Sequence, residues 1–211
     1  MDTKLIIGLG VLTIGGIYLF KKKRETQANV RHANAATSDL NDPATGAALS
    51  LKKALGVEKW PVAGWSGKRI RTEGGKADLF NACLEVTNWA ETQKVFSQTC
   101  DNEITLIGCL QEYCDTETYN TALQLIKADK VISTQTCNAM LTLYDENNKP
   151  INDGINTEFP ANAILGALVA SYNGNVSFIN GFQIDNDYWF VDLYKTTGYT
   201  AANKVKIVNP N

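Results

Sequence analysis

Residues 188–194, YWFVDLY, have the strongest strand pattern in this chain of 211 residues. Aromatic and β-branched residues fit a half-buried strand, and Thr197-Gly198-Tyr199 predicts a turn after it. Four further stretches of alternating or apolar residues predict strands, and Asn173-Gly174 is a hairpin signal between two of them. These strands cover residues 136–144, 164–172, 176–179 and 204–208, with Asn180-Gly181 closing the third. We therefore expect residues 131–211 to form a small antiparallel β-barrel or sandwich.

The order of motifs in this region resembles that of bacterial SH3-like domains. The resemblance covers roughly 50 residues, and it rests on Ile164-Leu165-Gly166, Tyr188-Trp189-Phe190-Val191, Gly198-Tyr199 and Val205-Lys206-Ile207. The chain departs from the family pattern at Trp189-Phe190-Val191, where the family has W-x-x-V, and at Thr200, where it prefers an apolar residue. The resemblance implies a barrel that binds wall peptides or polyproline segments in an aromatic groove around Tyr188, Trp189 and Tyr199.

Residues 76–130 have a helical pattern and predict a bundle of four short helices. Asn88 is expected to cap the second helix with Glu91 reaching back, residues 101–103 to open the third, and Asp115 to open the fourth. Four cysteines lie here, at positions 83, 100, 109 and 114. Their spacing is wrong for a zinc site, so we interpret them as small buried residues, with a disulfide as the alternative.

Residues 25–75 predict a polar linker, a short amphipathic helix that begins at Asp42-Pro43 and ends at Gly56, and a segment rich in Trp and Gly. The helix is expected to lie on a membrane or on the next domain. The second segment has two alternative interpretations, a cover for an edge of the folded domain or a partner-contact patch. The patch residues would be Trp60, Trp65, Arg69 and Arg71.

Residues 5–20, LIIGLGVLTIGGIYLF, are uncharged and predict a single transmembrane helix about 24 Å long. Cations follow this stretch, which favours a retained anchor over a cleaved signal peptide and places the C-terminal part in the cytoplasm. The residues expected within the membrane are Leu5, Ile6, Ile7, Gly8, Leu12, Ile14, Gly15, Ile17, Tyr18, Leu19 and Phe20. Those expected at lipid headgroups are Lys4, Lys21, Lys22, Lys23 and Arg24.

Charge and composition exclude several classes of function. Residues 1–76 carry 13 basic and 6 acidic side chains, whereas residues 77–211 carry 7 basic and 16 acidic ones. An acidic outer part disfavours nucleic-acid binding. The chain has one histidine, His32 in the linker, and no phosphate-binding loop, nucleophile motif or complete calcium loop, since Asp185-Asn186-Asp187 reads as a hairpin tip. We therefore expect no catalytic residue, metal or cofactor.

The sequence thus predicts an α+β protein with a transmembrane anchor (1–24), a linker (25–75), a helical bundle (76–130) and an SH3-like β module (131–211). The expected function is a non-catalytic structural protein that links a lipid membrane to a protein assembly. In outline it resembles minor membrane proteins of icosahedral bacteriophages that contain a membrane, with the C-terminal part facing the capsid. The partner contacts would be Trp60, Trp65, Arg69, Arg71, Tyr188, Trp189 and Tyr199. The alternatives are an envelope module that binds wall peptide or protein, and a membrane-tethered adaptor of a secretion or injection machine.

Overall fold

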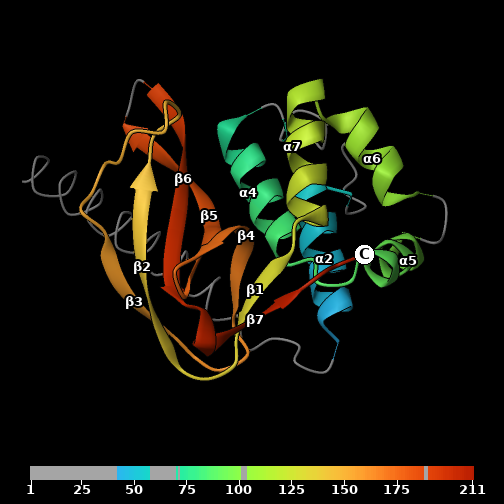
Figure 1. The fold of residues 1–211 in the computed structure, drawn as a ribbon. Coiled ribbons are helices and arrows are strands. Elements are labelled where there is room, and N and C mark those ends of the chain that lie inside the picture. Colours follow the sequence, from blue (N-terminus) through green and yellow to red (C-terminus); the bar gives the residue numbers. More distant parts are fainter. Residues whose placement is uncertain (1–41, 58–69, 71, 101–103, 188–189) are drawn as a thin grey trace, which may run out of the picture. The chain divides into compact units, whose positions relative to one another are not determined.

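The folded unit, residues 39–211, is an α+β structure in which helices gather on one side of an antiparallel sheet (Figure 1). This computed structural model describes residues 42–57, 70, 72–100, 104–187 and 190–211. The helices are α2 (Pro43–Leu55), α4 (Glu73–Leu84), α5 (Trp89–Thr99), α6 (Leu106–Tyr113) and α7 (Thr116–Lys127). The strands are β1 (Lys130–Ser133), β2 (Cys137–Tyr144), β3 (Ile155–Phe159), β4 (Ile164–Tyr172), β5 (Asn175–Asp187), β6 (Phe190–Ala201) and β7 (Val205–Val208), with a 3-10 turn η1 (Ala202–Lys204) before β7.

The helix starts follow from capping side chains. The Asn88 side chain accepts a hydrogen bond from the Glu91 amide (3.1 Å), and Asp115 accepts one from the Thr118 amide (2.7 Å), so both predicted caps are confirmed. The predicted opening of the third helix at residues 101–103 is wrong, because α6 begins at Leu106. Thr105 is its cap and accepts from the Gly108 amide at 3.1 Å.

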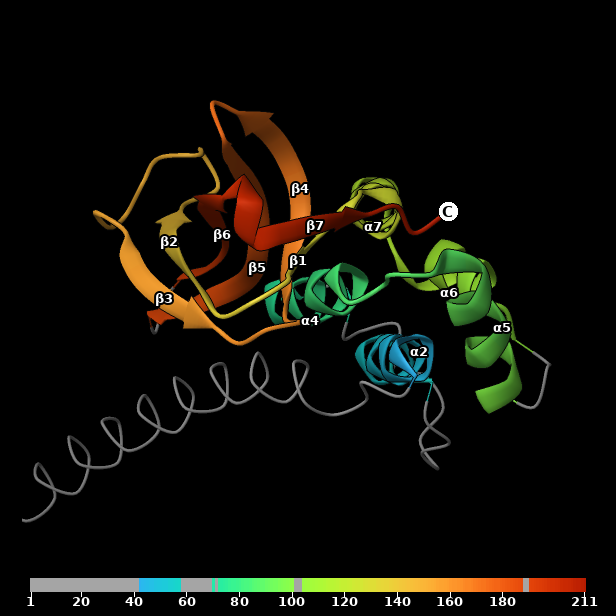
Figure 2. The ribbon, with the colours of Figure 1, turned by 60° about the horizontal axis from the view of Figure 1, so that its bottom comes forward.

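The predicted helix from Asp42-Pro43 to Gly56 is confirmed as α2. Pro43 occupies its first turn, and Gly56 ends it in the left-handed conformation with φ of 67°. The expected apolar face is buried, with Leu51 and Leu55 fully inaccessible to solvent. α2 packs against α4 and α5, so it belongs to the core of the folded unit (Figure 2).

All seven strands belong to one sheet, with the order β3-β2-β6-β5-β4-β1-β7 and antiparallel pairing throughout. The predicted hairpin at Asn173-Gly174 is confirmed, since both residues have positive φ and join β4 to β5. Two short strands, β1 and β3, were not predicted from the sequence. β3 and β7 are the edges of the sheet.

The predicted fold is wrong in its architecture, although the folded unit is α+β as expected. The strands form a single seven-stranded sheet that curls on itself (Figure 2), in place of a small SH3-like barrel or sandwich of five or six strands. Within the part of the chain that the structure describes, no helix has both the length and the apolar character needed to cross a bilayer. The segment predicted to span the membrane, residues 5–20, lies outside the described residues.

The turn predicted at Asn180-Gly181 is also wrong, because β5 continues through it as a β-bulge. Ile179 pairs with Thr197 and Gly181 pairs with Thr196, so Asn180 is the extra residue. Its side-chain amide donates to the Leu165 carbonyl at 2.8 Å. Gly166 lies beside the bulge with φ of +143°, and an added Cβ there would meet the Ile179 carbonyl oxygen at 1.9 Å. The bulge therefore requires asparagine at position 180 of β5 and glycine at position 166 of β4.

The bulge changes which residues of β5 face the helices. Before it, Asn175, Ser177 and Ile179 share one face of the sheet; after it, Phe182 and Ile184 continue that face. Phe182 then packs edge-on against Phe80 of α4, with ring centroids 5.1 Å apart. If Asn180 were an ordinary strand residue paired with β6, Gly181 and Gln183 would face α4, and the apolar contact would be lost.

A pair of hydrogen bonds joins the helices to the sheet at the same place. The Asn81 side chain on α4 donates to the Phe182 carbonyl and accepts from the Phe182 amide, both at 2.8 Å. The Asn81 side chain thus satisfies both the amide and the carbonyl of Phe182, as a neighbouring strand would.

The turn predicted at Thr197-Gly198-Tyr199 is wrong as well, because all three residues lie inside β6. Gly198 pairs with Phe178 on one side and Leu141 on the other. A Cβ at Gly198 would lie 2.6 Å from a Leu141 methyl and 2.7 Å from the Phe178 ring. The glycine makes room for the apolar side chains on the face turned away from α4, where Phe178 is fully buried.

We predict that Asn81→Ala lowers the free energy of unfolding by about 2 kcal/mol, because two hydrogen bonds are lost and the Phe182 backbone groups lose their partner. Gln183→Ala is the matched control, since Gln183 is exposed on β5, the strand to which Asn81 binds. The control should change stability by less than about 0.5 kcal/mol. Urea denaturation of both variants under reducing conditions measures this, and equal losses would contradict the assigned role of Asn81.

Candidate functional site

Of the seven residues predicted to contact a partner, the structure describes only Tyr199. It lies on β6 and its side chain is 53% exposed. The other six, Trp60, Trp65, Arg69, Arg71, Tyr188 and Trp189, lie outside the described residues, as do the residues predicted to contact lipid. The structure therefore describes the predicted patch at one position, where Tyr199 is exposed.

Tyr199 is part of a group of side chains on the half of the sheet face that the helices leave uncovered. The helical core covers β5 from Ile179, just before the bulge, through Phe182 beyond it, and α4 supplies most of the contact with this strand. The other end of β5 is exposed at Asn175 and half-buried at Ser177. We call this surface the open face, defined by Ala170 and Tyr172 on β4, Asn175 and Ser177 on β5, and Tyr199 and Ala201 on β6.

The strand register arranges the open face in two rows. Residues directly opposite one another in antiparallel strands point to the same side of the sheet. One row contains Tyr172, Asn175 and Ala201, and the next contains Ala170, Ser177 and Tyr199. In the second row Met140 of β2 follows Tyr199, and its side chain is half-buried.

The chemical character of the open face is neutral, polar and aromatic. None of its six residues carries a charge, although residues 77–211 hold 16 acidic side chains. Tyr172 is 76% exposed, the highest value among the large apolar and aromatic residues that the structure describes. Tyrosine with serine and asparagine is typical of surfaces that bind proteins, where charged side chains are depleted.

Tyr172 was not predicted as a contact residue, although the sequence held a signal for it. It ends the apolar run of residues 164–172, immediately before Asn173-Gly174. A tyrosine at the last position before a tight hairpin turn lies at the end of the sheet, where little can cover it. What the sequence could not show is that Tyr172 and Tyr199 share a face, since 27 positions and a full strand separate them.

A second concave surface lies between α4, α7 and β6. It is a hollow of about 330 Å³ whose lining includes four carboxylate side chains. Lys76 and Glu73 form an ion pair at 3.1 Å within it. Among the described residues no group of three or more His, Cys, Asp or Glu side chains could hold a metal ion. The lining residues are Glu73, Lys76, Phe80, Glu117, Thr118, Thr121, Glu146, Asp192 and Leu193.

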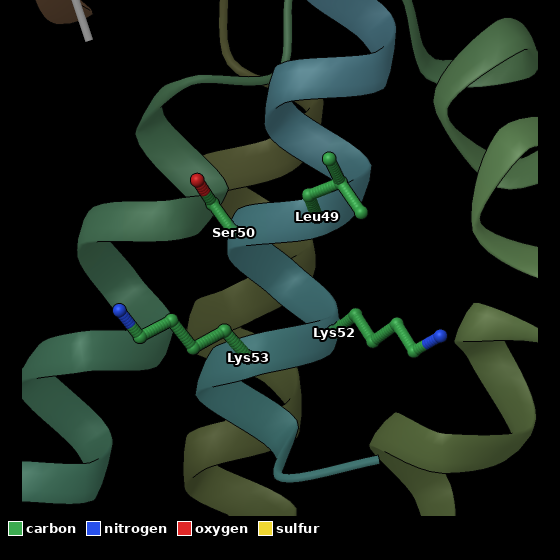
Figure 3. Close-up of a pocket in the computed structure, with 4 residues that line it drawn as sticks. All are labelled: Leu49, Ser50, Lys52 and Lys53. Atoms are coloured by element: carbon green, nitrogen blue, oxygen red, sulfur yellow. The ribbon is translucent and has the colours of Figure 1, made fainter. Parts of the chain in front are cut away.

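A third hollow, of about 430 Å³, lies along the outer side of α2. Its lining side chains diverge, with Lys52 and Lys53 extending to opposite sides of the helix (Figure 3). The Lys52 amine donates to the Thr99 carbonyl at the end of α5, so it serves the packing of two helices. Leu49 and Ser50 complete the lining. Polar groups that do not converge give no binding geometry for a small ligand.

Lys130 is the charged residue most deeply buried in the described part of the chain, with no exposed surface. Its amine donates to the carbonyls of Leu125 (2.7 Å), Ile126 (3.2 Å) and Ala128 (2.8 Å) at the end of α7. Burial lowers the pKa of Lys130 to about 8, while nearby Cys83 and Asp129 act in the opposite sense. The amine joins the last turn of α7 to β1 and reaches no solvent, so its role is structural.

The cysteines are free thiols, and the interpretation of them as small buried side chains is confirmed for Cys83 and Cys109. Burial raises the pKa of Cys109 to about 12 and that of Cys114 to about 11. It also raises the pKa of Cys83 far above the ordinary thiol value. Thiols with raised pKa are poor nucleophiles at neutral pH, which disfavours catalysis by these residues.

Comparisons with known proteins gave no match to any family model, curated protein or solved structure. The resemblances to SH3-like domains and to bacteriophage membrane proteins therefore stay predictions.

We predict that the stability of the wild type relative to Lys130→Met rises with pH between about 8 and 10.5. In this range the unfolded lysine binds a proton that the folded one has lost, so raising the pH favours the folded state. The slope approaches about 1.4 kcal/mol per pH unit and vanishes below pH 8. Urea denaturation of both proteins under reducing conditions measures the difference, in which the thiol contributions largely cancel. A stability difference between the two proteins that does not change with pH would contradict the lowered pKa of Lys130.

Proposed function

We propose that this chain is a non-catalytic structural protein that links a lipid membrane to a protein assembly. The open face supplies the protein contact, and the apolar and basic N-terminal sequence supplies the membrane contact. The setting that we favour is a minor component of a bacteriophage virion whose membrane lies inside an icosahedral shell.

The observation that carries the proposal is the open face. A neutral surface with two exposed tyrosines on a rigid sheet suits a protein partner, because aromatic anchors on a preorganised scaffold lose little entropy on binding. It does not suit nucleic acid or anionic lipid, both of which require basic side chains. The open face includes the end of β6, whereas Asp192 and Leu193 at the start of β6 line the hollow with carboxylates, so the protein contact is separate from that charged surface.

The membrane part of the proposal rests on sequence alone. Residues 5–20 contain no charged side chain, and Lys21, Lys22, Lys23 and Arg24 follow directly. An apolar stretch with adjacent cations binds bilayers that contain anionic lipid, and the cations favour the cytoplasmic side. A unit attached in this way would face the cytoplasm in a cell and the shell in a virion.

We predict that a photo-crosslinking amino acid at position 199 of the full chain captures a protein partner in the cells or virions that contain it. The matched control is position 155, where the exposed Ile155 lies on β3 outside the open face. A discrete crosslinked band at 199 and none at 155 supports the proposal. Equal capture at both positions, or none at either, would contradict it.

We further predict that changing Lys21, Lys22, Lys23 and Arg24 to Gln weakens binding of the full chain to anionic vesicles more than to neutral ones. Each cation near an anionic surface contributes about 1 kcal/mol, so four of them alter binding strongly. Flotation with vesicles of phosphatidylcholine, with and without phosphatidylserine, measures this. A loss that is the same for both vesicle types would argue against headgroup contacts by these residues.

A further inference from the structure

We propose that the protein partner at the open face is a second copy of this chain, packed face to face about a two-fold axis along β5. The inference rests on the proposed function, because it names the partner of the same surface. It follows from the arrangement of large and small side chains in the two rows.

The open face has an alternating pattern of tyrosine and alanine. In one row Tyr172 on β4 lies level with Ala201 on β6, and in the next row Ala170 on β4 lies level with Tyr199 on β6. The two tyrosines are about 10 Å apart across the strands and about 7 Å apart along them, given the usual strand spacing and rise. In these two rows each strand on either side of β5 thus presents one large and one small residue, and the exposed Val169 is the extra residue next to Ala170 in β4.

A two-fold axis along β5 places β4 of one copy over β6 of the other. The axis keeps each row at its own level, so Tyr172 meets Ala201 of the second copy and Tyr199 meets Ala170. In all four contacts between the two copies, a tyrosine ring therefore packs over the small alanine side chain opposite it. Along the axis Asn175 and Ser177 meet their own copies, and these polar side chains can donate and accept hydrogen bonds.

Charge also favours a second copy at this surface over self-association elsewhere. Residues 77–211 carry 16 acidic and 7 basic side chains, so contacts between other surfaces of this part of two copies bring acidic side chains together. The six residues of the open face carry no charge and meet their own copies without repulsion. Self-complementarity of one patch is the property that a two-fold interface requires.

The expected dimer is weak and depends on concentration. Six residues on each copy with their immediate neighbours form a patch at the low end of specific interfaces. Attachment to a membrane raises the effective concentration of the copies, so a weak contact suffices there.

Sedimentation equilibrium of the full chain in density-matched detergent tests the proposal by exchanging the large and small residues. Ala201→Tyr places two rings against each other and should weaken the dimer by about tenfold. Tyr172→Ala combined with Ala201→Tyr restores one ring for each methyl group and should recover the wild-type affinity. Ile155→Asp, outside the open face, should leave the affinity unchanged.

A wild type that stays monomeric overturns the proposal. A dimer whose affinity is unchanged by Ala201→Tyr also overturns it, because self-association would then occur elsewhere in the chain. Failure of the double exchange to restore the dimer overturns the assigned register. The crosslink at position 199 separates these failures from failure of the proposed function. A product of twice the chain mass supports a second copy, whereas a product with a different protein leaves the proposed function standing without this inference.

Discussion

The β-bulge at Asn180 is the constraint on which the rest of the folded unit depends. A strand alternates its side chains with a period of two, so one extra residue moves every later side chain to the other face. In β5 this shift brings Phe182 and Ile184 onto the face that α4 covers. The shift is possible because Asn180 binds the Leu165 carbonyl and because Gly166 leaves space for the Ile179 carbonyl.

The same bulge divides one face of the sheet into two halves with different roles. Beyond it, the Phe80–Phe182 ring contact and the paired hydrogen bonds of Asn81 close the sheet against the helices. Up to Ser177 this face carries small and polar residues on β5, whereas Ile179 and its partner Ala167 pack on the helical core, and Tyr172 and Tyr199 remain exposed. The closed half stabilises the scaffold, and the open half is free to take a partner. A rigid scaffold that presents a neutral aromatic surface is consistent with a structural role.

Local signals in the sequence predicted the parts of the fold that local chemistry controls. Asn88, Asp115 and Pro43 mark helix starts because a side chain or a fixed φ satisfies the first turn, and Asn173-Gly174 marks a hairpin because both residues accept positive φ. Gly198 and Asn180-Gly181 were read as turns for the same local reasons. Their true roles depend on partners far along the chain, such as Leu141 and Leu165, which a pattern of neighbours does not reveal. Because these two glycine sites were read as turns, the predicted strands were shorter than β5 and β6, and the predicted architecture of the sheet was wrong. For the candidate site, Tyr199 was predicted and Tyr172 was missed, because a shared face follows from register across three strands.

Hydroxyl-radical footprinting with detection of single residues tests the division of this face most directly. The account predicts fast oxidation of Tyr172 and Tyr199 in dilute solution, and strong protection of Phe80 and Phe182. Protection of both tyrosines at a dilution where the chain is monomeric, or rapid oxidation of Phe182, would contradict it. Either result would mean that the bulge does not set which half of the sheet the helices cover.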